Sequence, residues 1–303
     1  MLVVLRRTSG IVQDEGIAAY YNHRMELQTV IAAEPRGRIV AIDSAYHVDG
    51  RNTGRDVVVS ASYSGVLPAR FVAARAPRAA IGLDCGIGPD GAGIAGLWFY
   101  EALGIPAAAV DVATILLGDG VDVVEHGVLS RVNAPATACG VVPGMAVREA
   151  ALLLLRTDPG TPAPGEITHR TVMEEGPGGR QVVCTDSIAF GTAADTARNV
   201  LVTAGHTGRS AVPYLRDVAP WGFICSDGGR GRDDSGMAGL TIVEADGLAG
   251  ATVDARTARM GDGLSSYRDG VISAANATAR ERGVEVGMPA ARAAHLLLVG
   301  GEQ

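Results

Sequence analysis

The chain has 303 residues, a mass of 31.0 kDa and a net charge of −7, from 26 basic and 33 acidic side chains. All the basic side chains are arginine, because the sequence contains no lysine. This excludes a lysine Schiff base with a carbonyl substrate or with pyridoxal phosphate (PLP), a phosphate-binding P-loop and a Ser–Lys nucleophile pair. The negative charge argues against nucleic acid as a partner, since cationic side chains supply most of that affinity.

Hydrophobic residues make up 47% of the chain but aromatic residues only 4%, so we expect a core of Ala, Val, Leu and Ile. The longest apolar run, 150–155, is too short to span a membrane. The first ten residues carry their charge after the apolar residues, unlike a signal peptide. The four cysteines have no CxxC spacing, which favours a reducing compartment, the cytoplasm, over a disulfide or zinc framework.

The strongest pattern in the sequence is an internal duplication. When the sequence is shifted by 143 residues, residues 43–151 align with 186–294 without a gap, and roughly 40 of the 109 pairs are identical. A long repeat present twice is typical of two similar domains, whereas a solenoid needs three or more short repeats. We expect a first unit at 1–156, a Pro/Gly-rich linker at 157–166 and a second unit at 167–303, related by a pseudo-two-fold axis.

Apolar segments alternate with segments of helical pattern along each unit. In the first unit we expect strands at 56–62, 78–85 and 105–113, and helices at 66–76, 91–104, 123–139 and 144–155. The second unit repeats this order, with strands at 199–205 and 221–227. Nearly continuous apolar strands interleaved with helices predict an α/β layered fold with a largely parallel sheet in each unit. The segments that end at 48 and 190 are candidates for additional antiparallel strands.

Polar residues follow three expected strands in both copies, where open α/β sheets bind their ligands. SASYSG aligns with TAGHTG, DCGIGPD with DGGRGRDD, and DVAT with DART. The retained pairs are Ser44/Ser187, Asp84/Asp227, Asp90/Asp233, Asp111/Asp254 and Asp119/Asp262. Turns and helix caps explain a single retained aspartate as well as a shared site does.

The differences between the copies point to one site. The second copy has His206 where the first has Tyr63, and Asp234 where the first has Gly91. It also gains arginines beside these strand ends, at Arg209, Arg230, Arg232, Arg256 and Arg259. We therefore expect one functional site, on the second copy or between the copies. The residues of the first copy expected to line it are Tyr63, Asp84, Cys85 and Asp90.

Three kinds of site fit these residues. In the first, His206 is a general acid or base that Asp227 or Asp233 orients. The nucleophile is the hydroxyl of Ser187, Thr207 or Ser235, or a water molecule. In that site the substrate would be held by Thr207 and by Arg209, Arg230, Arg232 and Arg256. In the second, a divalent metal activates water, with His206, Asp227, Asp233 and Asp234 as ligands. In the third, glycine-rich turns bind a small anion without chemistry.

Three further features allow a functional and a structural interpretation. Cys85 follows a strand and precedes a helix, where a lowered pKa would make it a nucleophile. The sequence GIGPDG at 86–91 matches a dinucleotide fingerprint, but the second copy lacks its third glycine, so NAD is not expected. His23 and His169 are each followed by arginine, which indicates either packing or a shared central site.

We therefore expect an enzyme, namely a hydrolase acting on a small polar or anionic substrate, with an amide or another C–N bond as the candidate target. The alternatives are a non-catalytic small-molecule binding protein, and a lyase or isomerase that uses the same acid–base pair. The expected partners are a small molecule and further copies of the chain in a homo-oligomer, because Ala/Gly-rich faces favour self-association.

Overall fold

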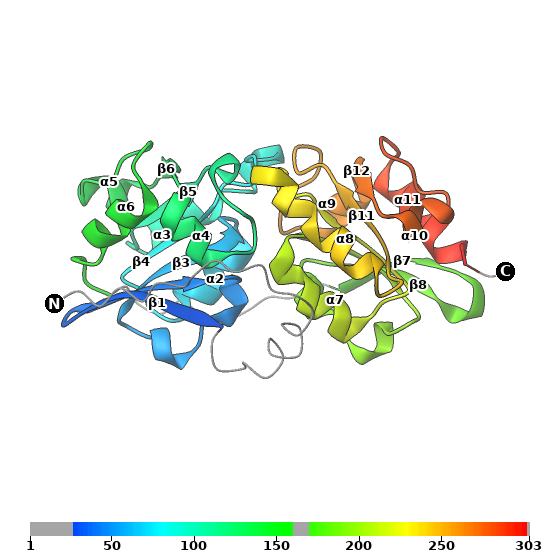
Figure 1. The fold of residues 1–303 in the computed structure, drawn as a ribbon, viewed down its shortest axis with the longest axis horizontal. Coiled ribbons are helices and arrows are strands. Elements are labelled where there is room, and N and C mark those ends of the chain that lie inside the picture. The colour runs from blue at the N-terminus through cyan, green and yellow to red at the C-terminus, as the bar shows by residue number, and fades with distance from the viewer. Residues whose placement is uncertain (1–26, 160–169, 302–303) are drawn as a thin grey trace.

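The computed structural model describes residues 27–159 and 170–301 and contains two similar units side by side (Figure 1). Each unit is a six-stranded, mostly parallel sheet with helices between its strands, so the expected α/β fold is confirmed. His23, His169 and residues 160–166 of the expected linker lie outside the described residues.

The strands of the first unit pair in chain order. They are β1 (Gln28–Glu34), β2 (Gly37–Ile42), β3 (Asp56–Tyr63), β4 (Ala79–Leu83), β5 (Ala107–Val110) and β6 (Leu129–Val132). Strands β2 to β5 are parallel, and β1 and β6 add antiparallel edges. The segment that ends at 48 thus contains β1 and β2; β1 is antiparallel to β2, and β2 is parallel to β3.

The second unit repeats this topology with the same strand directions. Its strands are β7 (Arg170–Glu175), β8 (Gln181–Thr185), β9 (Val200–His206), β10 (Gly222–Ser226), β11 (Ala249–Val253) and β12 (Ile272–Ala275). The alignment of the two copies in the sequence therefore corresponds to an alignment of two sheets.

Helices cover both faces of each sheet. The first unit has α2 (Val66–Ala73), α3 (Gly96–Ala102), α4 (Gly120–His126), α5 (Ala134–Ala138) and α6 (Val147–Leu154). The second has α7 (Val212–Val218), α8 (Ala238–Glu244), α9 (Gly263–Arg268), α10 (Ala277–Glu281) and α11 (Ala290–Val299). Each sheet therefore has two apolar layers; in the first unit, one lies under α2 and α3 and the other under α4 and α6. No helix within the described ranges is long and apolar enough to cross a bilayer.

The prediction of a single helix at 123–139 is wrong. This segment contains the end of α4, the antiparallel edge strand β6 and the short helix α5. The side chain of Asn133 caps α5 by accepting a hydrogen bond from the Ala136 N–H, and Pro135 occupies the first turn. Proline is tolerated there but not inside a helix, so Pro135 marks a new start rather than a kink.

The loops after the strands of each unit dock onto the other unit. Arg232 donates a hydrogen bond to Asp122 at 2.6 Å, and Arg259 donates one to Asp90 at 2.6 Å. The Leu117 N–H donates to the Ser235 hydroxyl at 3.0 Å. The strand-end loops that the sequence suggested as a site thus form much of the contact between the units.

A candidate binding pocket between the units

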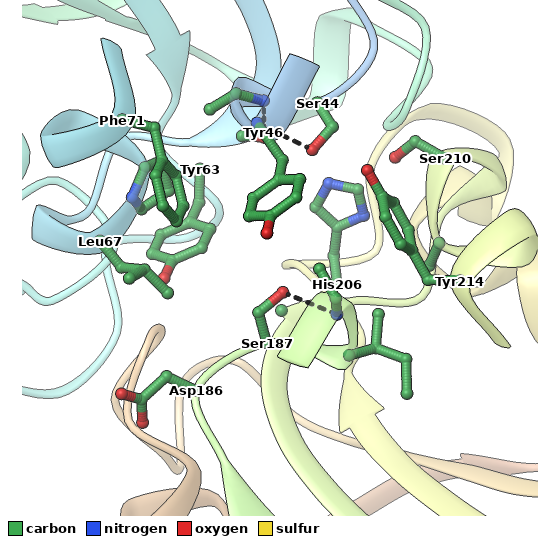
Figure 2. Close-up of a pocket in the computed structure, with 17 residues that line it drawn as sticks. Ser44, Tyr46, Tyr63, Leu67, Phe71, Asp186, Ser187, His206, Ser210 and Tyr214 are labelled. Atoms are coloured by element: carbon green, nitrogen blue, oxygen red, sulfur yellow. Dashed lines mark hydrogen bonds between the residues drawn. The ribbon is translucent and has the colours of Figure 1, made fainter. Parts of the chain in front are cut away.

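A pocket lies between the two units, and eight of its lining residues come from the first unit and nine from the second (Figure 2). Its empty space, including the part open to solvent, is about 570 Å³. Sixteen of the 17 lining residues form eight pairs that the shift of 143 residues relates. The pairs are Ser44/Ser187, Ala45/Ile188, Tyr46/Ala189, Ser62/Gly205, Tyr63/His206, Leu67/Ser210, Pro68/Ala211 and Phe71/Tyr214. The pocket therefore lies on the pseudo-two-fold axis of the duplication.

Irregularities at the ends of β3 and β9 aim Tyr63 and His206 at this pocket. The register of β3 with β4 shifts between Val59 and Tyr63, and that of β9 with β10 shifts before His206. Such bulges turn a strand and redirect its side chains. Both copies keep the irregularity, so equivalent positions meet at the axis although their chemistry differs.

His206 is buried, and both of its ring nitrogens bind main-chain atoms. Nδ1 accepts a hydrogen bond from the Gly208 N–H at 3.1 Å, so the proton resides on Nε2, which donates to the carbonyl of Ala61 in the first unit at 3.0 Å. Burial lowers the pKa of His206, which keeps the ring neutral. The ring thus joins the two units, and a proton can reach Nδ1 only if the bond from Gly208 opens.

Tyr63, the counterpart of His206, has no such partners. Its side chain is only 5% exposed, and its hydroxyl is buried without a hydrogen-bond partner. Burial and the nearby Asp186 raise the pKa of Tyr63, so the phenol keeps its proton. A Cβ on Gly261 would lie 2.3 Å from this hydroxyl, so the glycine, at φ +82°, makes room for the tyrosine.

Aromatic rings from both units surround the pocket. The ring centroid of Tyr46 lies 5.1 Å from Phe71, 6.2 Å from Phe190 and 6.2 Å from Tyr214, each in an edge-to-face arrangement. Edge-to-face pairs add a preference in geometry to the gain from apolar burial. Only 4% of the residues in the chain are aromatic, so the cluster is a notable concentration. Its surface suits the flat, apolar face of a small molecule.

Hydroxyl groups supply the polar part of the pocket. Ser44 and Ser187 each cap a short 3-10 turn and accept a hydrogen bond from the main-chain N–H two residues on, at 3.3 Å and 3.2 Å. Ser62 accepts from the Ala45 N–H at 2.9 Å. Each oxygen accepts one main-chain bond, so each hydroxyl keeps its proton and one further lone pair.

Charge at the pocket is acidic. Among the described residues that line it, Asp186 carries the one formal charge, and its Oδ1 accepts a hydrogen bond from the Gly263 N–H at 3.2 Å. Beside the pocket, His47 shares a 3.0 Å hydrogen bond with the hydroxyl of Tyr214. Burial lowers the pKa of His47 to about 4, so this ring is also neutral at pH 7.

The expected catalytic residues are not gathered at one place. His206 and Ser187 line the pocket, but Asp227 accepts hydrogen bonds from the N–H groups of Gly229 and Ala255 and so orders its own loop. The side chain of Asp233 is 83% exposed. Since the ring nitrogens of His206 bind main-chain atoms, the expected orientation of this histidine by Asp227 or Asp233 is not what the structure contains.

The expected substrate-binding residues have other partners. Arg230 binds Asp234 and Arg256 binds Asp254, both on the surface, while Arg232 crosses to Asp122 of the first unit. Arg209 is exposed and precedes Ser210, which lines the pocket. Thr207 is buried and donates to the carbonyl of Ser226 at 3.2 Å. None of these residues is among the described lining residues.

The expected metal ligands do not form a set. Across residues 27–159 and 170–301, no three His, Cys, Asp or Glu side chains lie close enough to hold an ion together. His206 is bonded through both nitrogens, Asp234 pairs with Arg230, and Asp227 binds main-chain N–H groups. The donor set proposed from the sequence therefore does not fit a divalent metal in this arrangement.

Of the expected residues in the first copy, only Tyr63 reaches the pocket. Asp84 accepts a hydrogen bond from the Gly86 N–H, and Asp90 pairs with Arg259. Cys85 is fully buried, and burial raises its pKa well above the usual value, so it is a thiol rather than a nucleophilic thiolate.

The sequence interpretation missed much of the pocket wall, including Phe71, Tyr214, Tyr46 and Asp186. One signal was visible, because the Asp-Ser pairs at 43–44 and 186–187 are retained in both copies. Phe71 and Tyr214 are both aromatic but not identical, and Tyr46 aligns with Ala189, so a search for identical residues does not find them. In comparisons with known proteins, no family model, curated protein or solved structure matches the chain.

Proposed function

We propose that the inter-unit pocket binds a small, uncharged ring compound that carries an amide or a related carbonyl group. The observation that carries this proposal is the hydroxyl of Tyr63, which is buried without a hydrogen-bond partner at the end of a side chain that lines the pocket. A buried hydroxyl that makes no hydrogen bond costs about 1–3 kcal/mol, and a ligand acceptor would recover that cost.

The apolar walls favour a flat ring. Tyr46 of the first unit lies edge to face with Tyr214 of the second unit. Phe71, also of the first unit, packs against Tyr46. Ligand sites commonly combine such apolar walls with a few fixed polar groups. A ring of five or six members would contact aromatic side chains from both units at once.

The polar edge favours an amide. Tyr63 offers a proton to a carbonyl oxygen, while Asp186 presents a carboxylate to an N–H group. A ligand that carries a hydrogen-bond acceptor next to a donor, as an amide –CO–NH– does, matches these two groups of the protein. An anionic ligand would instead face Asp186 with no arginine among the described lining residues.

Three probes of one shape and different charge test this proposal: 4-fluorobenzamide, 4-fluorobenzoate and 4-fluorobenzamidine. Titration of the protein into each, followed by the ¹⁹F line width, should give saturable binding that is strongest for the neutral amide. Saturable binding of the benzoate with none of the amide would contradict the proposal, as would no binding of any probe.

Hydrolysis of that amide is the second candidate, and it keeps the function expected from the sequence. The observation that favours it is that hydroxyls of Ser44 and Ser187 line the same pocket as His206. Water would add to the carbonyl carbon and the C–N bond would break, which releases an acid and an amine. His206 must first give up its bond from Gly208 to accept a proton. Release of aniline from acetanilide, lost in Ser187→Ala, would support hydrolysis.

We also propose that the protein works in the cytoplasm as a homo-oligomer. All four cysteines are free, and Cys85, Cys184 and Cys225 are buried as thiols, which suits a reducing compartment. Light scattering tests the assembly, because a 31.0 kDa species at all concentrations would contradict it.

A further inference from the structure

A second cavity lies inside the first unit, against the wall of the inter-unit pocket. It shares Ala45, Ser62, Tyr63 and Pro68 with that pocket, and its empty space, including the part open to solvent, is about 270 Å³. Its other lining residues are Val58, Ser60, Ser64, Ala69, Val72, Ala80, Ile81, Gly82 and Tyr100. It extends the pocket on one side of the pseudo-two-fold axis.

The second unit carries larger side chains at most of the matching positions, although Gly205, His206, Ala211 and Val243 are smaller than their counterparts. The shift of 143 residues pairs Ala80 with Phe223, and Gly82 with Cys225. The further replacements toward larger side chains are Ala45/Ile188, Val58/Leu201, Ser60/Thr203, Ala69/Val212 and Val72/Leu215. The same backbone thus encloses a filled core in the second unit and a hollow one in the first.

A neighbouring pair on two strands accounts for most of this difference. In the second unit, Phe223 on β10 is beside Gly250 on β11, and a Cβ on Gly250 would lie 2.1 Å from the phenyl ring. In the first unit, the same register places Ala80 beside Ala107. Gly250 therefore makes the room that Phe223 occupies, whereas Ala80 and Ala107 leave space between the sheet and α2 and α3.

Hydroxyl groups at the positions that line this cavity and at their counterparts also differ in their hydrogen bonding. In the second unit, Thr207 donates to the Ser226 carbonyl, and Thr203 donates to the sulfur of Cys225. Ser64, the counterpart of Thr207, is 6% exposed and its hydroxyl has no partner. Burial without a partner is costly, so a residue kept in this state points to a group that the chain itself does not supply.

We propose that this cavity is a subsite for a short, polar-ended substituent on the ring compound, with Ser64 as the group that binds the polar end. The subsite rests on the proposed function of the inter-unit pocket. It makes the ligand asymmetric although the pocket walls are paired, because the substituent has a place in the first unit and none at the matching positions of the second.

A series of substituted amides separates the subsite from the pocket. The parent, 4-fluorobenzamide, tests the pocket alone, and its N-ethyl and N-(2-hydroxyethyl) derivatives add a tail without and with a polar end. On the whole chain, we expect the hydroxyethyl amide to bind about tenfold more tightly than the parent, from apolar burial and one hydrogen bond. The N-ethyl amide should lie between them.

The double substitution Ala80→Phe with Ala107→Gly transfers the pair of the second unit into the first. It fills the subsite, so the hydroxyethyl amide and the parent should then bind with a ratio near one. Ala107→Gly alone is the matched control, because it removes a methyl group without filling the space and should keep the tenfold ratio.

Ser64→Ala keeps the test valid if the double variant does not fold. Removing a hydroxyl that has no partner leaves the fold intact, and the advantage of the hydroxyethyl amide over the N-ethyl amide should disappear. The advantage of the N-ethyl amide over the parent should remain, because the apolar part of the cavity is unchanged.

Two results would overturn the proposal and are distinguishable. If the parent binds but neither tail improves its affinity, the cavity holds water or remains empty, and the pocket proposal stands without a subsite. If the parent itself does not bind, the proposed function fails and the subsite fails with it.

Discussion

The two units share one topology but differ in what lies between the sheet and its helices. The second unit fills this layer with Phe223, whose ring is 0% exposed, while the first leaves a cavity beside Ala80. Large buried side chains stabilise a core, and cavities weaken it. The difference indicates that the second unit has the more tightly packed core, whereas the first unit holds the cavity that we propose as a ligand subsite.

The polar groups at the axis show the same division. His206 of the second unit binds main-chain atoms through both nitrogens, and one of those bonds reaches Ala61 of the first unit. Tyr63 at the matching position of the first unit leaves its hydroxyl without a partner. A duplicated position has thus become a joint between the units in one copy and a free donor in the other.

The largest effect should come from opening the filled core. Phe223→Ala should lower the free energy of unfolding by about 3–5 kcal/mol, because it removes a fully buried ring. Phe71→Ala, in the first unit, should cost clearly less, since that ring borders the pocket. Urea unfolding of both variants checks the comparison, and equal losses would remove the distinction between the units.

A second effect depends on pH through His47, whose counterpart in the second unit is Phe190. The pKa of His47 falls from the usual 6.5 to about 4 in the folded protein, so the unfolded chain takes up the proton first. The contribution of neutral His47 to the free energy of unfolding is complete above pH 6.5. It is lost as the pH falls toward 4, by up to about 3 kcal/mol. His206, also lowered, acts in the same direction.

The substitution His47→Phe places the residue of the second unit in the first and should flatten that dependence between pH 6.5 and 4. Unfolding measured at both pH values gives the slope for the wild type and the variant. An unchanged slope would mean that His47 does not titrate differently in the folded and unfolded chains.

The smallest effect compares the two matched hydroxyls. Thr207→Val removes a hydroxyl that binds the Ser226 carbonyl and should cost about 1–2 kcal/mol. Ser64→Ala removes one without a partner and should change stability by less than about 0.5 kcal/mol, or raise it. Thermal unfolding of the two variants side by side is sufficient, and a larger loss in Ser64→Ala would contradict the assignment of bonded and unbonded hydroxyls.

Much of the fold could be predicted from the sequence, because the duplication fixed two similar units and apolar runs located β3, β4 and β5. The segment 123–139 misled the prediction, since its helical spacing concealed an edge strand that only pairing with β5 stabilises. Edge strands depend on their neighbours more than on their own pattern.

The site was harder to predict, for a physical reason. The gain of arginines in the second copy suggested an anion site, but Arg232 binds Asp122 across the unit boundary and Arg256 binds its neighbour Asp254. Which charged side chains pair with each other depends on how the two units dock. The sequence of one copy alone does not determine that docking. His206 was correctly placed at the pocket, whereas its bonds to Ala61 and Gly208 could not be foreseen.

The central claim is that the free hydroxyl of Tyr63 binds a neutral carbonyl ligand in the pocket between the units. A ¹⁹F titration of 4-fluorobenzamide with the wild type and with Tyr63→Phe tests it most directly. We predict saturable binding to the wild type and about tenfold weaker binding to the variant, which loses one hydrogen bond and keeps the ring. Equal affinity in the two proteins, or no saturable binding to the wild type, would contradict the claim.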